Sequence, residues 1–334
     1  MRTRVHSTTS FFGAIAMTLL ITVDGFAVTT KWNVAGPADW NDPGNWDAGV
    51  PSAANPGGIN NGGTAMISAP APNVNDLGVG WPAGPANPTG FLNIVTGGSL
   101  TVNNTGDVSV GVKTSDNVST LTVAGGSLTT IFGSGTGNLY IGNETGSKGQ
   151  VILSSGTIAV ANDLAVGYSG LATLVVSGSS GTITVGNFKV ADVGGGSGTL
   201  DVRIDAGGIS PITLNAGSVA IDNGAGSATL AVSLLALAPT TDLVLINNVG
   251  GGPVSGSLFA GLPDESPISA SLGLTTYNWL LSYDYDAASS LDGSGNDIAL
   301  KFVSVETVPE PSGFALAVSA AGIALLSRRR RDQK

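Results

Sequence analysis

The clearest hydrophobic pattern in the chain is a five-residue motif that occurs five times. In each copy, Asp or Asn is followed by an apolar residue, any residue, a second apolar residue and then Gly or Ala. The apolar positions lie two residues apart, so in a strand both side chains point to one face. The copies begin at residues 76, 107, 138, 163 and 187, which places successive starts 31, 31, 25 and 24 residues apart. This period is typical of a stacked repeat architecture.

Each repeat also contains three short pieces of alternating apolar and polar residues, separated by Gly. Alternation with period two indicates strands with one buried face, and the Gly density disfavours helices between residues 28 and 311. We therefore predict an all-β fold, a single-stranded right-handed parallel β-helix with three short strands per coil, over residues 76–250. The alternative is a meander of hairpins in a β-sandwich or prism.

Two modules are expected to cap the ends of the coil. Residues 28–75 are rich in Trp, which fits an aromatic cap over the open end of stacked strands. Residues 251–305 form a closing module. Their order of a Gly-Leu-Pro turn, an aromatic strand and a Gly-Asn-Asp-apolar strand resembles the closing segment of bacterial autotransporter-like passenger repeats. An alternative role for the aromatic residues is a glycan-stacking face, for which the candidates are Trp40, Trp46 and Trp81.

The charge distribution argues against a nucleic-acid partner. The chain has a formal net charge of −10, and only 11% of its residues are charged. Between residues 28 and 311, Arg203 and five Lys stand against 21 Asp and Glu, whereas a phosphate backbone needs clustered Lys and Arg. The surface is therefore expected to consist mainly of Ser, Thr, Asn and Gly.

Residues 1–27 have the features of a secretory signal peptide. Arg2 and Arg4 form a positive start, residues 11–23 are mostly apolar, and a small-x-small sequence ends at Ala27. We predict a signal helix that is cleaved after Ala27. The alternative is a buried N-terminal helix.

The C-terminal residues 306–334 contain three features in a fixed order. Residues 312–327 are almost wholly apolar, which predicts a transmembrane helix, although a short one. The basic residues after it would stay cytoplasmic. A Pro-Glu-Pro motif precedes this segment. The motif and its preceding Val are Val308, Pro309, Glu310 and Pro311, and the basic end is Arg328, Arg329, Arg330 and Arg331.

This tail resembles the PEP-CTERM sorting signal of Gram-negative-type bacteria. The resemblance covers residues 308–334 and implies recognition and cleavage by a membrane-embedded, exosortase-type protease. It also implies passage through the inner membrane and association with an exopolysaccharide matrix. An ordinary membrane anchor is the alternative.

The residue inventory argues against catalysis. His6 lies inside the leader and there is no Cys, so Ser-His-Asp, Cys-dependent and typical zinc chemistry lack their residues. Asp76, Asp107 and Asp163 would stack in one column, but Asn replaces Asp in two copies, which indicates turn chemistry rather than a glycosidase acid pair. The acidic stretch 284–297 is the best calcium candidate, although its spacing suits a solvated turn better. We predict no catalytic residue, metal ligand or cofactor.

Together these observations predict an exported, non-enzymatic protein of the cell surface or extracellular matrix, with a structural or adhesive role. The alternatives are a carbohydrate-binding module and a polysaccharide-degrading β-helix enzyme.

Overall fold

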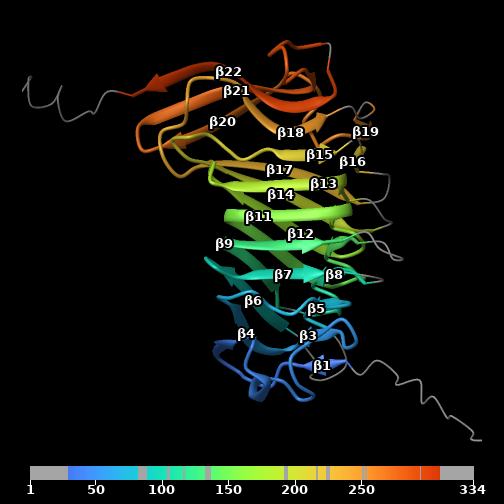
Figure 1. Cartoon of the computed structure of the whole chain (residues 1–334). Helices are drawn as coiled ribbons and strands as arrows, with labels where there is room; N and C mark the ends of the chain where they lie inside the picture. The colour runs from blue at the N-terminus through green and yellow to red at the C-terminus, as the bar shows by residue number, and fades with distance from the viewer. Residues whose placement is uncertain are drawn as a thin grey trace, which may run out of the picture.

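The computed structural model describes residues 29–308, except 82–88, 104–105, 116, 132–136, 192–194, 216, 223–225, 250–251, 253 and 294. Within these residues the regular structure is β-strand, apart from one short 3-10 turn, η1 (Pro43–Asn45). The strands wind into a β-solenoid of about seven turns, which Figure 1 shows as a rod. The all-β repeat fold is therefore confirmed. The hairpin meander is wrong for the body, because its strands pair in parallel.

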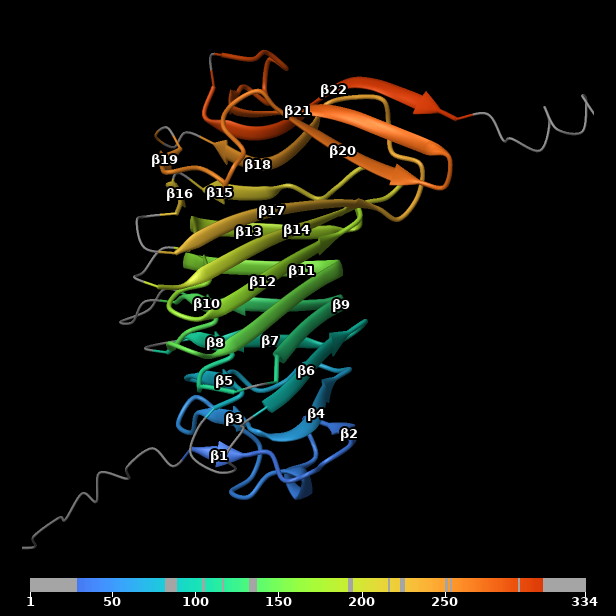
Figure 2. The ribbon, with the colours of Figure 1, turned by 180° about the vertical axis from the view of Figure 1, so that it is seen from behind.

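Each coil contributes strand segments to three parallel sheets. The first sheet, on the near side in Figure 2, continues through the first parts of two long strands, β9 (Ser119–Thr130) and β11 (Lys148–Val166). Its other strands are β2 (Pro37–Asp39), β4 (Asn61–Ile67), β6 (Thr89–Val95), β12 (Leu171–Ser177), β14 (Ser197–Ile204) and β17 (Ser227–Leu234).

The second sheet uses the later parts of β9 and β11, because these strands continue around a corner of the coil. Its other strands are β7 (Ser99–Val102), the first part of β13 (Gly181–Val190), β15 (Ile212–Asn215) and β18 (Leu243–Val249).

The third sheet contains the motif predicted from the sequence, together with the last parts of β11 and β13. Its other strands are β1 (Thr30–Lys31), β3 (Gly57–Ile59), β5 (Leu77–Val79), β8 (Val108–Val110), β10 (Leu139–Ile141), β16 (Val219–Ile221) and β19 (Ser255–Gly256). Parallel pairing therefore begins before residue 76, inside the predicted cap. The early coil was missed because β3 and β4 begin with Gly and Asn rather than with an apolar pair.

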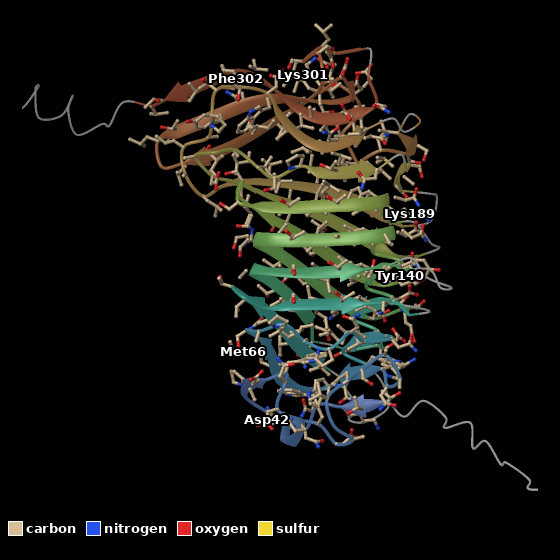
Figure 3. The ribbon with its side chains drawn as sticks, in the orientation of Figure 1. Asp42, Met66, Tyr140, Lys189, Lys301 and Phe302 are labelled. Atoms are coloured by element: carbon tan, nitrogen blue, oxygen red, sulfur yellow. The ribbon has the colours of Figure 1, made fainter. Side chains whose placement is uncertain are left out.

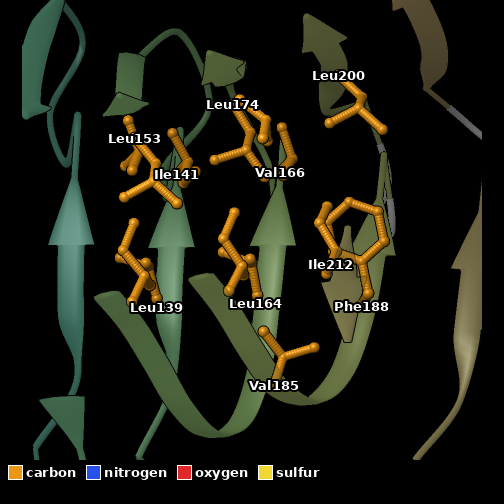
Figure 4. Packing of buried hydrophobic residues seen from close by; sticks show 14 of the residues in the cluster. Leu139, Ile141, Leu153, Leu164, Val166, Leu174, Val185, Phe188, Leu200 and Ile212 are labelled. Atoms are coloured by element: carbon orange, nitrogen blue, oxygen red, sulfur yellow. The ribbon is translucent and has the colours of Figure 1, made fainter. Parts of the chain in front are cut away.

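All five motif copies stack in register in the third sheet, as predicted. Val108 pairs with Leu77 and Leu139, and Leu164 pairs with Leu139 and Phe188. These five side chains are fully buried. Figure 4 shows the inward side chains of neighbouring coils in contact. The apolar column is continuous, so each coil buries its residues against the coils before and after it.

The Asp and Asn residues of the motif connect neighbouring coils. The side-chain oxygen of Asp107 accepts the backbone N–H of Asn138 at 2.9 Å, and that of Asn138 accepts the N–H of Asp163 at 3.1 Å. Asp76 and Asn187 accept the N–H of Asp107 and Ser218 in the same way. The sequence predicted bonding of these side chains to the backbone within turns. The structure refines this prediction, because the acceptors bond the next coil and form a ladder.

The N-terminal end is closed by three buried indoles, with exposures of 1% for Trp32, 0% for Trp40 and 4% for Trp46. Trp46 contacts both other rings edge-on, at centroid distances of 5.0 and 4.7 Å, and its Nε1–H donates to the carbonyl of Trp40 at 2.8 Å. The alternative that Trp40 and Trp46 stack against a glycan is therefore wrong. Burial leaves neither ring with an accessible face.

The C-terminal end is closed by an antiparallel sheet of β20 (Ser266–Leu272), β21 (Thr275–Tyr285) and β22 (Asp297–Thr307). β22 also pairs antiparallel with β18, the last strand of the second sheet. Figure 1 shows this sheet across the top of the rod. Its inner face carries Trp279, Leu281 and Leu300, all buried.

The described residues contain no helix that is long and apolar enough to cross a membrane. The predicted signal peptide 1–27 and transmembrane segment 312–327 lie outside those residues.

Candidate functional site

The outer face of the third sheet carries a hollow of about 230 Å³, which we call the Trp81 groove. It lies over the corners formed by the first three motif copies. Its lining residues are Asp76, Leu77, Gly78, Trp81, Asp107, Ser109, Val112, Asn143 and Glu144.

Trp81 forms the aromatic wall of the groove. It follows Gly80, whose positive φ of 82° turns the chain at the end of β5. The indole lies against Gly78, the middle residue of β5. A Cβ at position 78 would lie 2.4 Å from the Cβ of Trp81 and 2.8 Å from its ring. The indole can therefore pack on the strand because Gly78 has no side chain, and the ring stays partly exposed.

The polar wall of the groove comes from the next two coils. Ser109 is the middle residue of β8 and is 8% exposed. Its Oγ accepts a hydrogen bond from Nδ2 of Asn143 at 3.1 Å. The backbone N–H of Asn143 donates to the carbonyl of Gly111 at 2.9 Å, which fixes the start of its side chain. The hydroxyl proton of Ser109 and the amide oxygen of Asn143 both belong to groups that can bond hydroxyl-rich ligands.

Three carboxylates complete the lining. Burial, together with the nearby charge of Asp107, raises the pKa of Asp76, although backbone hydrogen bonds oppose the shift. Glu144 forms an ion pair with Lys113, whose Nζ lies 2.6 Å from Oε1 and 2.7 Å from Oε2. The groove is therefore acidic, and the ammonium group of Lys113 offsets the charge of Glu144.

More aromatic and charged groups follow on the same face. Tyr140 occupies the position equivalent to Ser109 in the next coil, and its ring centroid lies 4.5 Å from that of Tyr168. Lys189 pairs with Asp163 at 2.8 Å two coils further along. Figure 3 shows Tyr140 and Lys189 along one edge of the rod.

The acidic stretch 284–297 is bonded to protein donors. Asp297 accepts the N–H groups of Asn248 at 2.6 Å and Ala287 at 2.8 Å. Asp292 accepts Ser282 and Lys301. Among the described residues, no three or more His, Cys, Asp or Glu side chains are grouped so that they could hold a metal ion.

The site residues predicted from the sequence therefore do not lie together in one site. Trp81 lines a groove, whereas Trp40 and Trp46 are buried. Val308 is the last described residue. It is 60% exposed, and its N–H donates to Leu274 at 3.0 Å. Ala27, Pro309, Glu310, Pro311 and Arg328–Arg331 lie outside the described residues.

Sequence reasoning missed Ser109, Asn143 and Glu144. One signal was available. Ser109 is the middle residue of a motif copy, a position that alternation places on the outer face, and Asn143 directly follows the Gly of the next copy. Aligning the copies by coil would have placed both beside Trp81.

The comparisons with known proteins found no matching family model, no matching curated protein and no matching solved structure.

Proposed function

We propose that this chain is an exported, non-enzymatic protein of the cell surface or extracellular matrix, with a structural or adhesive role. The observation that carries the proposal is the unbroken apolar column, closed by three indoles at one end and by an antiparallel sheet at the other. Such a rod holds its outer faces at fixed spacing, and its low charged fraction of 11% suits contact with hydrated polysaccharide.

The carboxylates of the motif support the non-enzymatic assignment. Asp76 and Asp107 each accept a backbone N–H of the next coil, which is a structural use. A glycosidase needs a general acid and a second carboxylate set on opposite sides of the bond to be cleaved. Release of reducing sugars or unsaturated uronates by the purified protein would overturn this part of the proposal.

The route of export rests on the two ends of the sequence. The leader ending at Ala27 would direct export, and the tail from Val308 to Arg331 would present the Pro-Glu-Pro motif to an exosortase-type protease while residues 312–327 cross the inner membrane. An exopolysaccharide is the proposed matrix partner.

Mass spectrometry of the protein from cells with and without the sorting protease tests this route. We expect a C-terminus near residues 309–311 in the first case and the full-length C-terminus in the second. A Pro309→Ala, Pro311→Ala variant should behave like the second case, whereas Pro263→Ala, in a surface loop, should be processed normally. Identical full-length C-termini in both cells would contradict the sorting proposal.

The winding sense is part of the same proposal. In Figure 1 the strands of the second sheet lie in front and run from left to right. In Figure 2, which shows the molecule from behind, the strands of the first sheet lie in front and also run from left to right. With the chain rising from the Trp-rich end, these directions support the predicted right-handed coil.

Carbohydrate binding is the second candidate function. The observation that favours it is the partly exposed indole of Trp81 beside the hydroxyl and amide groups of the groove.

A further inference from the structure

The indole of Trp81 offers a flat apolar surface next to polar groups. Its position is fixed by contact with Gly78, so little freedom is lost when a ligand stacks on the exposed part. Aromatic faces carry negative charge density and attract the C–H groups of a flat ring. A pyranose ring presents such C–H groups on its faces and hydroxyls at its rim.

The polar wall matches the rim of such a ring. Ser109 accepts a bond from Asn143 and can still donate its own proton. Asn143 retains an amide oxygen as an acceptor. Glu144 and Asp107 add carboxylate oxygens that accept from sugar hydroxyls. The groove therefore holds both donors and acceptors within one sugar-sized volume of about 230 Å³.

The charge of the lining selects among sugars. Asp76, Asp107 and Glu144 all carry carboxyl groups, and Lys113 is engaged with Glu144. A uronate carboxylate in the groove would meet like charge at short range, which disfavours binding. An uncharged ring avoids this cost and uses the carboxylates as acceptors.

We propose that the Trp81 groove binds one uncharged pyranose ring within a longer glycan that runs along the rod. Tyr140 lies in the coil after Ser109 and contacts the next ring. The spacing of neighbouring coils, about 4.8 Å, sets the step along the glycan. This inference deepens the adhesive role and names the class of glycan.

Quenching of Trp fluorescence by acrylamide tests the proposal in the isolated exported protein. All five Trp are among the described residues, and four of them are buried, so Trp81 gives the quenchable signal. The buried four are Trp32, Trp40, Trp46 and Trp279. The probes are hexasaccharides of glucose, N-acetylglucosamine and galacturonate. We expect at least one of the two neutral probes to protect Trp81, and the galacturonate probe to give no protection.

Calorimetry with the protecting probe then uses matched variants. We expect Trp81→Ala to weaken binding at least about tenfold, and Asn143→Ala about threefold. Phe91→Ala is the control, because Phe91 is a partly exposed aromatic residue on the outer face of the first sheet. Its affinity should equal that of the wild type. Circular dichroism would check the fold of each variant.

Three results would overturn the inference. These are binding of galacturonate as tightly as the neutral probes, full affinity in both Trp81→Ala and Asn143→Ala, and no protection by either neutral probe. Any of these leaves the export route untouched, because that route is tested in cells by the processed C-terminus.

Discussion

The solenoid and the C-terminal sheet bury their apolar residues in different ways. In the solenoid, Leu164 meets its counterparts Leu139 and Phe188, which lie 25 and 24 residues away. In the C-terminal sheet, Leu300 pairs with Leu243 and Leu281, which are not copies of one another. The solenoid therefore repeats one contact, whereas the C-terminal sheet depends on contacts that occur once.

Polar groups show the same difference. In the solenoid, equivalent Asp and Asn residues bond one coil to the next. In the C-terminal sheet, the hydroxyl of Tyr283 accepts the N–H of Phe259 at 3.1 Å and donates to the carbonyl of Leu262 at 2.9 Å. Burial raises the pKa of Tyr283 to about 12, so it stays protonated over the ordinary pH range. If one rung of the Asp and Asn ladder is lost, the equivalent bonds between other coils remain. The hydrogen bonds of Tyr283 have no such equivalents.

The largest expected effect tests the apolar column of the solenoid. Phe188→Ala removes a fully buried ring between two coils and should lower the free energy of unfolding by about 3–5 kcal/mol. Urea denaturation measures the loss. Phe91→Ala, on the partly exposed outer face, should cost clearly less. Equal losses for the two variants would mean that the column is not the main source of stability.

A smaller effect is expected at the corner after the motif. Gly111 has a φ of 70°, and an added Cβ would lie 2.4 Å from the carbonyl oxygen of Lys148. Gly111→Ala should therefore cost at least about 2 kcal/mol in urea denaturation. The reverse change, Ala191→Gly at the equivalent corner, should stay within about 1 kcal/mol. Ala191 has a φ of 56°, and its Cβ has room because the neighbouring residue is Gly226, where an added Cβ would lie 3.1 Å from it. A neutral Gly111→Ala would contradict this account of the corner.

The next prediction concerns the C-terminal sheet. Tyr283→Phe leaves the N–H of Phe259 and the carbonyl of Leu262 without this partner, and should cost about 1–3 kcal/mol. Because the contact has no copy, limited proteolysis should cut this sheet first and leave the solenoid intact. Simultaneous loss of both parts would show that the two regions unfold as one unit.

The smallest effect is a pH dependence in the C-terminal sheet. Partial burial opposes the charge of Asp292, but hydrogen bonds from Lys301 and Ser282 outweigh it and lower the pKa of Asp292 below its ordinary 3.8. Because the pKa of Asp292 is lower in the folded than in the unfolded protein, the ionised carboxylate stabilises the fold above about pH 4. This contribution is lost as the pH falls through the pKa of the folded state. The groups are partly exposed, so the effect should be about 0–1 kcal/mol. Urea midpoints at pH 7 and pH 3 measure it, and Lys301→Met should reduce the difference. If Lys301→Met left the pH dependence of the urea midpoint unchanged, the pairing of Asp292 with Lys301 would not be its cause.

The third sheet could be predicted from the sequence because its motif repeats the same apolar pair at each coil. Leu77, Leu139 and Leu164 reveal both the face and the register. The early coil of β3 and β4 could not be placed, because its inward Ile59 and Ile67 lie among Gly and Asn rather than in an apolar pair.

The pairing of β22 with β18 was also beyond the sequence, since it joins segments more than 50 residues apart without a repeated motif. The residues that line the Trp81 groove were equally hard to predict from the sequence. Trp81 could be named as a candidate from its residue type. Ser109 and Asn143 become its neighbours only after coils are stacked in space.

The direction of β22 has a consequence for crowded surroundings. β18 offers one edge to β15, and β22 covers the other by running against it. The N–H and C=O groups at this edge of β18 are already paired with β22, so a strand from another molecule cannot pair there. End-on fibril growth therefore has no template at this edge. The protein can therefore accumulate at high density without polymerising through this strand.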